Sequence, residues 1–307
     1  MPSWARYDIW NIGIATLDRP PVDVGDLLPL RNVRWLPPQP ALHLLADPFP
    51  YRHDGRDWLL AEAYGHPRGV RGRIVRIDPD DPTAAPAPPA IVRAHHVSYP
   101  CTFSDGERTY CAPEMSQEDG CAIYALGRDG GWTPALHVLR GTRIVDPTIF
   151  RFDGRWWLFG AEPPPSHTSV LNAYYADALD GPWTPHARNP IKRDVASARP
   201  GGRPFAIRDR VYRPAQDCSA TYGGALHVME ILALTPADFQ ERVALRLEPQ
   251  REWPYPDGLH HLVVDGARIY FDAKRTHVDW LLWLKTRGER GQSPRGDGLQ
   301  SPRGGRA

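Results

Sequence analysis

The sequence lacks the features that would tie it to a membrane, to nucleic acid or to a transition metal. No apolar run approaches the about 18 residues that a spanning helix needs, and the N-terminus MPSWARYDIW has no apolar stretch typical of a signal peptide. The formal net charge is only +1, so no global field favours nucleic acid or a lipid surface. Neither a CxxC pair nor an HExxH motif is present, so we predict no metal and no cofactor. The default expectation is a cytoplasmic protein without a membrane span.

Cysteine is scarce, with four in 307 residues. Cys101 and Cys111 flank one predicted turn and Cys121 begins the next predicted strand, so spacing leaves a cross-strand disulfide open. Free buried thiols are the favoured interpretation, because cysteine is a common small apolar core residue and the cytosol is reducing.

One pattern, an apolar strand, a tight turn and a second apolar strand, occurs five times along the chain. The aspartates in the five turns fall 51, 48, 56 and 56 residues apart: Asp54, Asp105, Asp153, Asp209 and Asp265. This period is close to that of one four-stranded propeller blade. We therefore predict an all-β fold, a single five-bladed β-propeller over residues 1–286, followed by a disordered basic Pro/Gly/Arg tail over residues 287–307.

Candidate outer strands follow each hairpin. The third-strand candidates are GRIVRID from Gly72, CAIYALG from Cys121, VLNAYYADA from Val170, GALHVMEILAL from Gly224 and VDWLLWLK from Val278. A fourth candidate follows in the first four repeats but not in the fifth. The segment DIWNIGIAT from Asp8 is expected to fill that gap and close the last blade, which removes an exposed sheet edge.

Hairpin geometry predicts where a site would lie. In a propeller the innermost strand of each blade begins at one mouth of the central channel, and the second strand returns to that mouth. The residues that open first strands and close second strands therefore converge. They are Asp47 with Glu62, Tyr99 with Glu114, Asp146 with Glu162, Arg199 with Asp217, and His260 with Lys274.

Several carboxyl groups at one mouth permit acid–base chemistry, for example on a glycosidic bond, which needs one ionised and one protonated carboxyl group. We expect Asp47 to act as the base and Glu162 or Glu114 as the acid. Asp146 would tune the acid and orient the sugar. Asp-Pro is also an ordinary turn device, because Asp caps its own backbone and proline fixes the next dihedral angle, so purely structural roles for Asp47 and Asp146 stay open.

The fourth repeat indicates a charged ligand. Arg199, Arg203 and Arg213 lie on or beside predicted channel strands, and guanidinium groups match phosphate or carboxylate geometry. This favours a phosphosugar, a sugar nucleotide or a uronic acid, unless the arginines pair with Asp217 or Asp209 instead. The other residues expected to bind substrate are Gln216, Asp217, His260, Glu62 and Tyr99. An axial His260 could also hold an ion or shuttle protons.

The chain resembles the N-terminal propeller domain of glucosamine inositolphosphorylceramide transferases, and related propellers of bacterial glycan assembly, from roughly Trp10 to Lys285. The motifs that carry the resemblance are, in order, ADPFPY, SYPCTF with APEMS, DPTIF with GRWWLF, GPWTPH, ARPGG, and YRPAQD followed by YGG. In that family a glycosyltransferase domain follows the propeller, whereas here only the tail is expected. The resemblance implies a sugar-related propeller. Two functions stay open: an enzyme that makes or breaks a glycosidic bond, or a non-catalytic recognition or scaffold module beside a separate glycosyltransferase.

More distantly, the chain is similar to the five-bladed arabinanases and β-xylosidases. Those hydrolases carry a general-base Asp opening blade one, a pKa-tuning Asp opening blade two and a general-acid Glu in blade three. Asp47, in ADPF, matches the first position, while Tyr99 and Asp146 stand at the second and third. The resemblance implies a base role for Asp47 and a redistribution of the other two roles.

Overall fold

The computed structural model describes residues 6–38, 42–65, 71–81 and 89–278. Within these ranges the chain is almost entirely β-strand and loop, with one 3-10 helix at Val24–Leu27, and no helix is long and apolar enough to cross a membrane. Contacts divide the chain into two units, residues 1–8 with 276–307 and residues 9–275. The tail predicted at 287–307 lies outside the described residues, and the cytoplasmic location stays a prediction.

The five predicted hairpins are confirmed, each as an antiparallel pair of strands. They are β3 (Leu42–His53) with β4 (Arg56–Gly65), β7 (Ser98–Asp105) with β8 (Arg108–Glu114), β11 (Val145–Phe152) with β12 (Arg155–Ala161), β16 (Phe205–Ile207) with β17 (Arg210–Asp217), and β20 (Leu262–Asp265) with β21 (Arg268–Val278). Asp54 and Gly55 form the turn of the first hairpin, with φ values of 49° and 74°. Two successive positive φ values are typical of the tight type I′ turn, which Asp-Gly favours.

Outer strands extend four of the hairpins. They are β5 (Arg73–Ile77) and β6 (Pro89–Ile91), β9 (Cys121–Leu126) and β10 (Trp132–Val138), β13 (Val170–Ala176), β14 (Thr184–Pro185) and β15 (Lys192–Arg193), and β18 (Ala225–Leu234) and β19 (Phe239–Leu247). The third strands predicted for these repeats are therefore present. The strands at the fourth place are shorter in two repeats, three residues in β6 and two in β14, where proline removes a backbone donor.

The N-terminal strand belongs to the sheet of the last hairpin. β1 (Arg6–Thr16) lies next to β21, and β2 (Arg34–Trp35) pairs with β1. This differs from the prediction, because β1 occupies the place expected for VDWLLWLK, which lies outside the described residues after Val278. One parallel bridge between Trp10 and Leu44 joins this sheet to the sheet of β3 to β6, so the two form one eight-stranded sheet.

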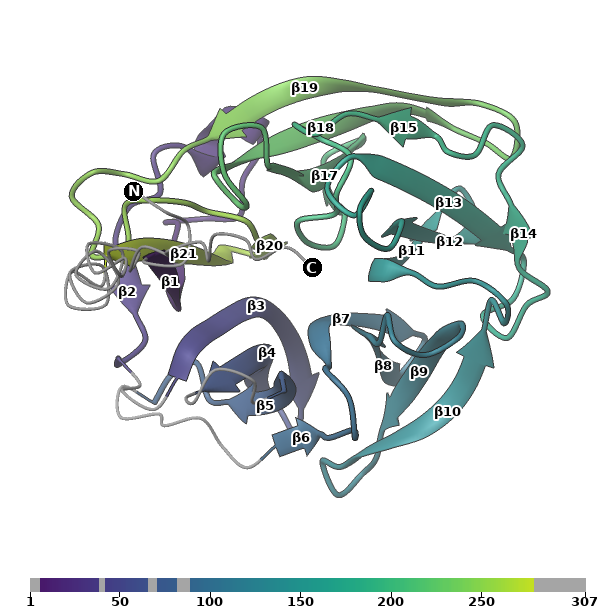
Figure 1. The fold of residues 1–307 in the computed structure, drawn as a ribbon, viewed down its shortest axis with the longest axis horizontal. Coiled ribbons are helices and arrows are strands. Elements are labelled where there is room, and N and C mark those ends of the chain that lie inside the picture. The colour runs from purple at the N-terminus through teal and green to yellow at the C-terminus, as the bar shows by residue number, and fades with distance from the viewer. Residues whose placement is uncertain (1–5, 39–41, 66–70, 82–88, 279–307) are drawn as a thin grey trace, which may run out of the picture. The chain divides into compact units, whose positions relative to one another are not determined.

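Figure 1 shows the sheets of the larger unit arranged around a common centre, with β3, β7, β11 and β20 as inner strands. Apolar side chains fill the space between adjacent sheets, and one such cluster joins Tyr110 of β8 to Trp156 of β12. Another joins Tyr270 of β21 to Leu59 of β4 and Val75 of β5. This packing leaves the polar ends of the inner strands to meet near the centre.

Removing residues 1–16 should abolish cooperative unfolding of the larger unit, measured by calorimetry or a circular dichroism melt. β1 is the hydrogen-bonded neighbour of β21 and supplies Ile12 and Ile14, 0% and 4% exposed, to the core. As a control, Ile12→Ala in the intact chain should lower the free energy of unfolding by about 2–5 kcal/mol and keep the transition cooperative. A truncated protein that still melted cooperatively at the original temperature would contradict this role of β1.

Candidate functional site

Three inner strands carry the same strained bulge, near the start of β7 and β11 and inside β3. Asp47, Tyr99 and Asp146 each precede a proline, and their φ values are 52°, 43° and 51°. At each of these positions the register of the hairpin slips. Left-handed backbone is costly for a residue with a bulky side chain, so the surrounding packing must hold it, and such strain is concentrated at functional sites. A bulge also re-aims the side chain it carries, and all three side chains contact neighbouring sheets.

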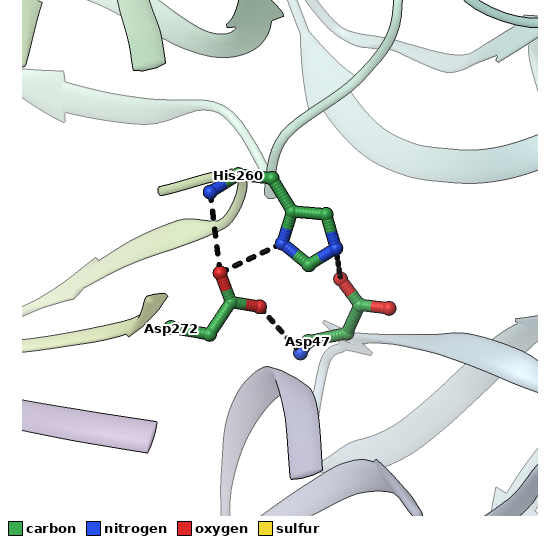
Figure 2. A group of neighbouring side chains, drawn as sticks. All are labelled: Asp47, His260 and Asp272. Carbon is green, nitrogen blue, oxygen red and sulfur yellow. Dashed lines mark hydrogen bonds and ion pairs between the residues drawn. The ribbon is translucent and has the colours of Figure 1, made fainter. Parts of the chain in front are cut away.

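Asp47 stands at one end of a chain of buried polar groups, shown in Figure 2. Asp272 on β21 is 0% exposed and accepts a hydrogen bond of 2.7 Å from Nδ1 of His260. It also accepts from the backbone amides of His260, His261 and Asp47, at 3.2, 3.1 and 2.9 Å. Because Nδ1 of His260 is engaged in this way, its Nε2 faces Oδ1 of Asp47 at 3.9 Å.

Burial and neighbouring charges shift the pKa values of these groups in different directions. Burial raises the pKa of Asp47 to about 7, opposed by His260 and reinforced by the charges of Asp272 and Asp146. Burial alone would raise the pKa of Asp272, but the charge and the hydrogen bond of His260 hold it below its ordinary value. For His260 burial favours the neutral ring, yet Asp272 and Asp47 raise its pKa above the ordinary value. Asp47 is thus poised to exchange a proton near neutral pH.

His261 follows His260 in the chain, but its ring is packed against aromatic side chains. Its ring is fully buried, packs edge-on to Phe49 and Tyr99, and lies with Nδ1 at 3.4 Å from Oδ1 of Asp47. Burial lowers the pKa of His261 to about 3, so the ring is neutral. Neither ring nitrogen has a hydrogen bond of normal geometry within the described part of the chain.

Asp146 forms a buried ion pair with Arg199. Arg199 donates from Nε at 2.6 Å and from Nη2 at 3.3 Å, and Gln216 donates to the same carboxylate at 3.3 Å. The backbone amide of Asp146 donates to Oε2 of Glu114 at 3.1 Å. Burial, and then the charge of Asp146, raise the pKa of Glu114 to about 8. A carboxylate paired with a guanidinium group and a carboxyl group of raised pKa therefore lie side by side.

Glu62 is the third acid of this group. Its pKa is raised well above the ordinary value by burial, and then by the charges of Asp47 and Glu114. Nε2 of His96 lies 3.3 Å from Oε1 of Glu62, while Nδ1 of His96 accepts a hydrogen bond of 3.0 Å from the amide of Gly72. The accepting role of Nδ1 places the ring hydrogen on Nε2. A Cβ at Gly72 would lie 2.5 Å from Cε1 of His96 and 2.8 Å from Oε1 of Glu62, so a larger residue there would displace both side chains.

The structure brings together most of the residues predicted from sequence. The group linked by hydrogen bonds, ion pairs or mutual charge effects contains Asp47, Glu62, Glu114, Asp146, Arg199, Gln216 and His260; we call it the carboxylate cluster. Glu162 is half-buried, and within the described ranges no hydrogen bond or ion pair connects its side chain to this cluster. The geometry thus favours Glu114 over Glu162 as the acid.

Two of the three predicted arginines are used elsewhere. Arg213 is 2% exposed and forms a two-pronged ion pair with Glu241, at 2.8 and 2.7 Å. Arg203 donates to the carbonyl of Thr102 at 3.2 Å and lines a cavity of about 260 Å³ with Asp265, in the turn between β20 and β21. The expected arginine cluster is therefore not formed, because only Arg199 faces the carboxylates and Asp146 already matches its charge.

Asp217 is also engaged by its neighbours. Its carboxylate accepts from the amide of Ser219 at 3.0 Å and lies 3.3 Å from Nη2 of Arg246. The Asp217 carboxylate therefore stabilises the turn at the end of β17 and is already paired.

Tyr99 connects three inner segments through its hydroxyl group. The hydroxyl lies 2.9 Å from Oγ1 of Thr148 and accepts a hydrogen bond of 3.0 Å from the amide of Gly202. Gly202 has a φ of 136°, and a Cβ there would lie 2.0 Å from the carbonyl oxygen of Leu262. Tyr99 therefore has a structural role, because its hydroxyl group joins three segments of the chain.

Sequence reasoning missed Asp272 and Trp10. A lone acid inside the apolar run IYFDA was the available signal for Asp272. Trp10 stacks on His260, with ring centroids 4.1 Å apart and the planes at 28°. Its partner is about 250 residues away in sequence, so no local pattern indicates the contact.

A divalent cation has one possible set of ligands among the described residues. Asp47, His260 and Asp272 each offer an atom within 4.8 Å of the other two. Asp272 already accepts four hydrogen bonds, so it would orient His260 while Asp47 and Nε2 of His260 face the ion. The sequence predicted no metal, and the residues are compatible with one.

The fold is that of known glycoside hydrolases. The structure is similar to Zg3597, a family 117 glycoside hydrolase of the marine bacterium Zobellia galactanivorans, with a TM-score of 0.53, 12% sequence identity, and coverage of 94% of this chain and 99% of that chain. It is also similar to the RS223 β-xylosidase, with a TM-score of 0.50, 12% identity, and coverage of 64% and 73%. At these identities the likeness concerns the fold alone. The fold class is thus all-β, and the fold is shared with these glycoside hydrolases.

The family follows from the sequence. The family model described as glucosamine inositolphosphorylceramide transferase 1, N-terminal, matches residues 40–264, and the chain belongs to this family. It is 28% identical over 273 residues to glucosamine inositolphosphorylceramide transferase 1 of Arabidopsis thaliana, covering 79% of this chain and 35% of that protein. It is 34% identical over 158 residues to the Oryza sativa subsp. japonica protein of the same name, covering 50% and 21%. The chain spans about a third or less of the length of these relatives.

Tyr99→Phe should lower the free energy of unfolding by about 1–3 kcal/mol, because the buried amide of Gly202 loses its acceptor. Chemical denaturation measures this directly. Thr148→Val removes the other partner of the hydroxyl, and also the hydrogen bond of 3.1 Å that Thr148 donates to the carbonyl of Asp146, but it leaves the amide of Gly202 paired with Tyr99. Equal stability of Tyr99→Phe and wild type would show that the hydroxyl carries no structural role.

Stability should fall as the pH rises from about 6.5 to 8. Asp47 and Glu114, with pKa values of about 7 and about 8, keep protons in the folded state that they have lost in the unfolded state. The unfolded chain then binds fewer protons, so raising the pH favours unfolding, by up to about 1.4 kcal/mol per pH unit for each such group. Below this window, the lowered pKa of His261 opposes the trend, because the unfolded ring binds a proton that the folded ring does not.

Denaturant unfolding at several pH values tests this dependence. Asp47→Asn and Glu114→Gln, which cannot titrate, should each flatten the slope. Glu248→Gln, at a side chain 65% exposed, is the matched control and should leave it unchanged. A wild-type stability that rose between pH 6.5 and 8 would contradict the protonation states assigned to the cluster.

Proposed function

We propose that the carboxylate cluster binds a sugar and makes or breaks a glycosidic bond, at the centre of a five-bladed propeller whose last blade contains β1. The observation that supports this most strongly is the contrast between neighbouring acids. The carboxylate of Asp146 is paired with the guanidinium group of Arg199, whereas burial raises the pKa of Glu114 to about 8, so Glu114 is protonated at neutral pH. Glycosidic chemistry needs this combination of an ionised and a protonated carboxyl group.

In the proposed reaction Asp47 is the general base. It removes a proton from the attacking hydroxyl group, of water or of an acceptor sugar, as the new bond to the anomeric carbon forms. The bond from that carbon to the leaving oxygen breaks, and Glu114 donates its proton to this oxygen. Asp146 supports the acid, because its charge raises the pKa of Glu114 and its amide binds Oε2. His260, held by Asp272, positions Asp47.

A neutral or amine-bearing sugar fits the cluster better than an anionic one. Acids outnumber the permanent cations around the cluster, and the one arginine that faces it is already paired with Asp146. The relatives are named for a transferase of glucosamine, which supports an amino sugar as the ligand. Of the ligands predicted from sequence, phosphosugars and uronic acids therefore have less support, while a sugar nucleotide remains compatible through its sugar.

A second candidate is a recognition module that holds a sugar for a separate glycosyltransferase. The family model is described as the N-terminal part of a transferase, and the chain spans about a third or less of the matched relatives. Tyr99, at a position where the distant hydrolases carry an acid, also supports binding without hydrolysis.

Thermal-shift measurements with product analysis test the proposal, using aryl glycosides of glucosamine and N-acetylglucosamine and the corresponding UDP-sugars. Wild type should turn over at least one of these. Asp47→Asn and Glu114→Gln should still bind it, with turnover reduced at least about 100-fold, the usual contribution of a general acid or base. Glu162→Gln is the matched control and should keep its activity. Binding by all variants without product from wild type would replace the enzyme with the recognition module.

A further inference from the structure

We propose that Tyr222 is an aromatic platform on which a pyranose ring of the ligand stacks beside the carboxylate cluster. This inference rests on the proposed carbohydrate site and assigns it a binding residue. Tyr222 belongs to the loop between β17 and β18, within the run TYGG. Its side chain contributes to neither the core clusters nor the proposed acid–base chemistry.

Tyr222 is exposed, whereas the residues around it are buried. It is 39% exposed, against 5% for Trp10, 3% for His260 and 8% for Arg199. The edge-on contacts of its ring have centroid distances of 5.5 Å to His260 and 6.3 Å to Trp10. The guanidinium carbon of Arg199 lies 5.2 Å from the ring centroid.

These contacts connect the exposed ring of Tyr222 to the neighbours of two carboxylates in the cluster, Asp47 and Asp146. His260 is the residue whose Nε2 faces Asp47, and Arg199 is the ion-pair partner of Asp146. A ligand whose polar groups reach these two carboxylates therefore lies within reach of Tyr222.

The loop is anchored at the backbone of Tyr222. Lys274 of β21 is only 1% exposed, and its Nζ donates to the carbonyl oxygen of Tyr222 at 2.7 Å and to Oγ1 of Thr221 at 3.3 Å. The amide of Leu259 donates to the carbonyl oxygen of Gly223 at 2.9 Å. Burying an ammonium group is costly unless it is well paired, so its use here indicates that the position of the loop matters.

The glycine after Tyr222 brings the loop close to the cluster. Gly223 has a φ of 58°, and a Cβ there would lie 2.7 Å from both Cβ of His260 and Cη2 of Trp10. Only glycine allows this approach. The motif YGG thus combines an exposed ring with the backbone that holds it beside His260.

The chemistry of the platform favours a sugar. A pyranose has a C–H face that packs on an aromatic ring, and hydroxyl groups at its edge that bind carboxylates and guanidinium groups. Tyrosine offers a rigid apolar ring at low entropic cost. A nucleobase also presents a flat face, so the experiment must separate the sugar from the base of a sugar nucleotide.

Binding of glucosamine, N-acetylglucosamine and UDP to the full-length protein, measured by calorimetry and saturation-transfer NMR, tests the platform. Tyr222→Ala should weaken binding of the sugars at least about tenfold and remove saturation transfer to their C–H protons, with UDP unaffected. Tyr222→Phe keeps the ring and should bind within about threefold of wild type. Lys274→Met, which releases the loop, should weaken sugar binding in the same direction as Tyr222→Ala.

Leu232→Ala truncates a side chain on β18 that is 52% exposed, and should change neither binding nor stability. If wild type binds a sugar and Tyr222→Ala binds it equally, the platform is wrong while the sugar site stands. If Tyr222→Ala weakens UDP and not the free sugars, the ring binds a base and the inference is also wrong. If wild type binds none of the sugars, the platform and the proposed function fail together.

Discussion

The centre of this protein depends on the hydrogen bonds that converge on Asp272. One buried carboxylate accepts from the ring and amide of His260 and from the amides of His261 and Asp47. These bonds join the last hairpin to the bulge at Asp47 in the first, over 225 residues of sequence. A buried charge is stable only when it is well paired, so satisfying this carboxylate ties β21 to the bulge of β3.

The need to pair buried charges also explains why the acids of the cluster differ in their surroundings. Asp272 and Asp146 have charge-assisted partners in His260 and Arg199. For Glu114 and Glu62, burial and then the charges of neighbouring carboxylates raise the pKa values. The chain thus holds similar carboxyl groups in different protonation states within one cluster, which is the property that an acid–base site requires.

The bulges of this fold carry side chains with different roles. The overall fold resembles that of a family 117 glycoside hydrolase, and within it Tyr99 links strands through its hydroxyl group. The three left-handed bulges are retained regardless of whether aspartate or tyrosine occupies them. The backbone device that aims a side chain is therefore separable from the chemistry of that side chain.

Local patterns were enough to predict the five hairpins, the pairing of an N-terminal strand into the last sheet, and the convergence of Asp47, Asp146 and Glu114, because alternation and Asp-Gly turns act over a few residues. The roles of the arginines were not predictable in this way. Arg213 was assigned to a ligand, but Glu241, on a strand further along, neutralises it. Asp272, Trp10 and the platform at Tyr222 likewise acquire their roles from partners far away in sequence. Charge pairing and stacking act through space, so only the packed sheets decide which polar groups pair with one another and which remain available for a ligand.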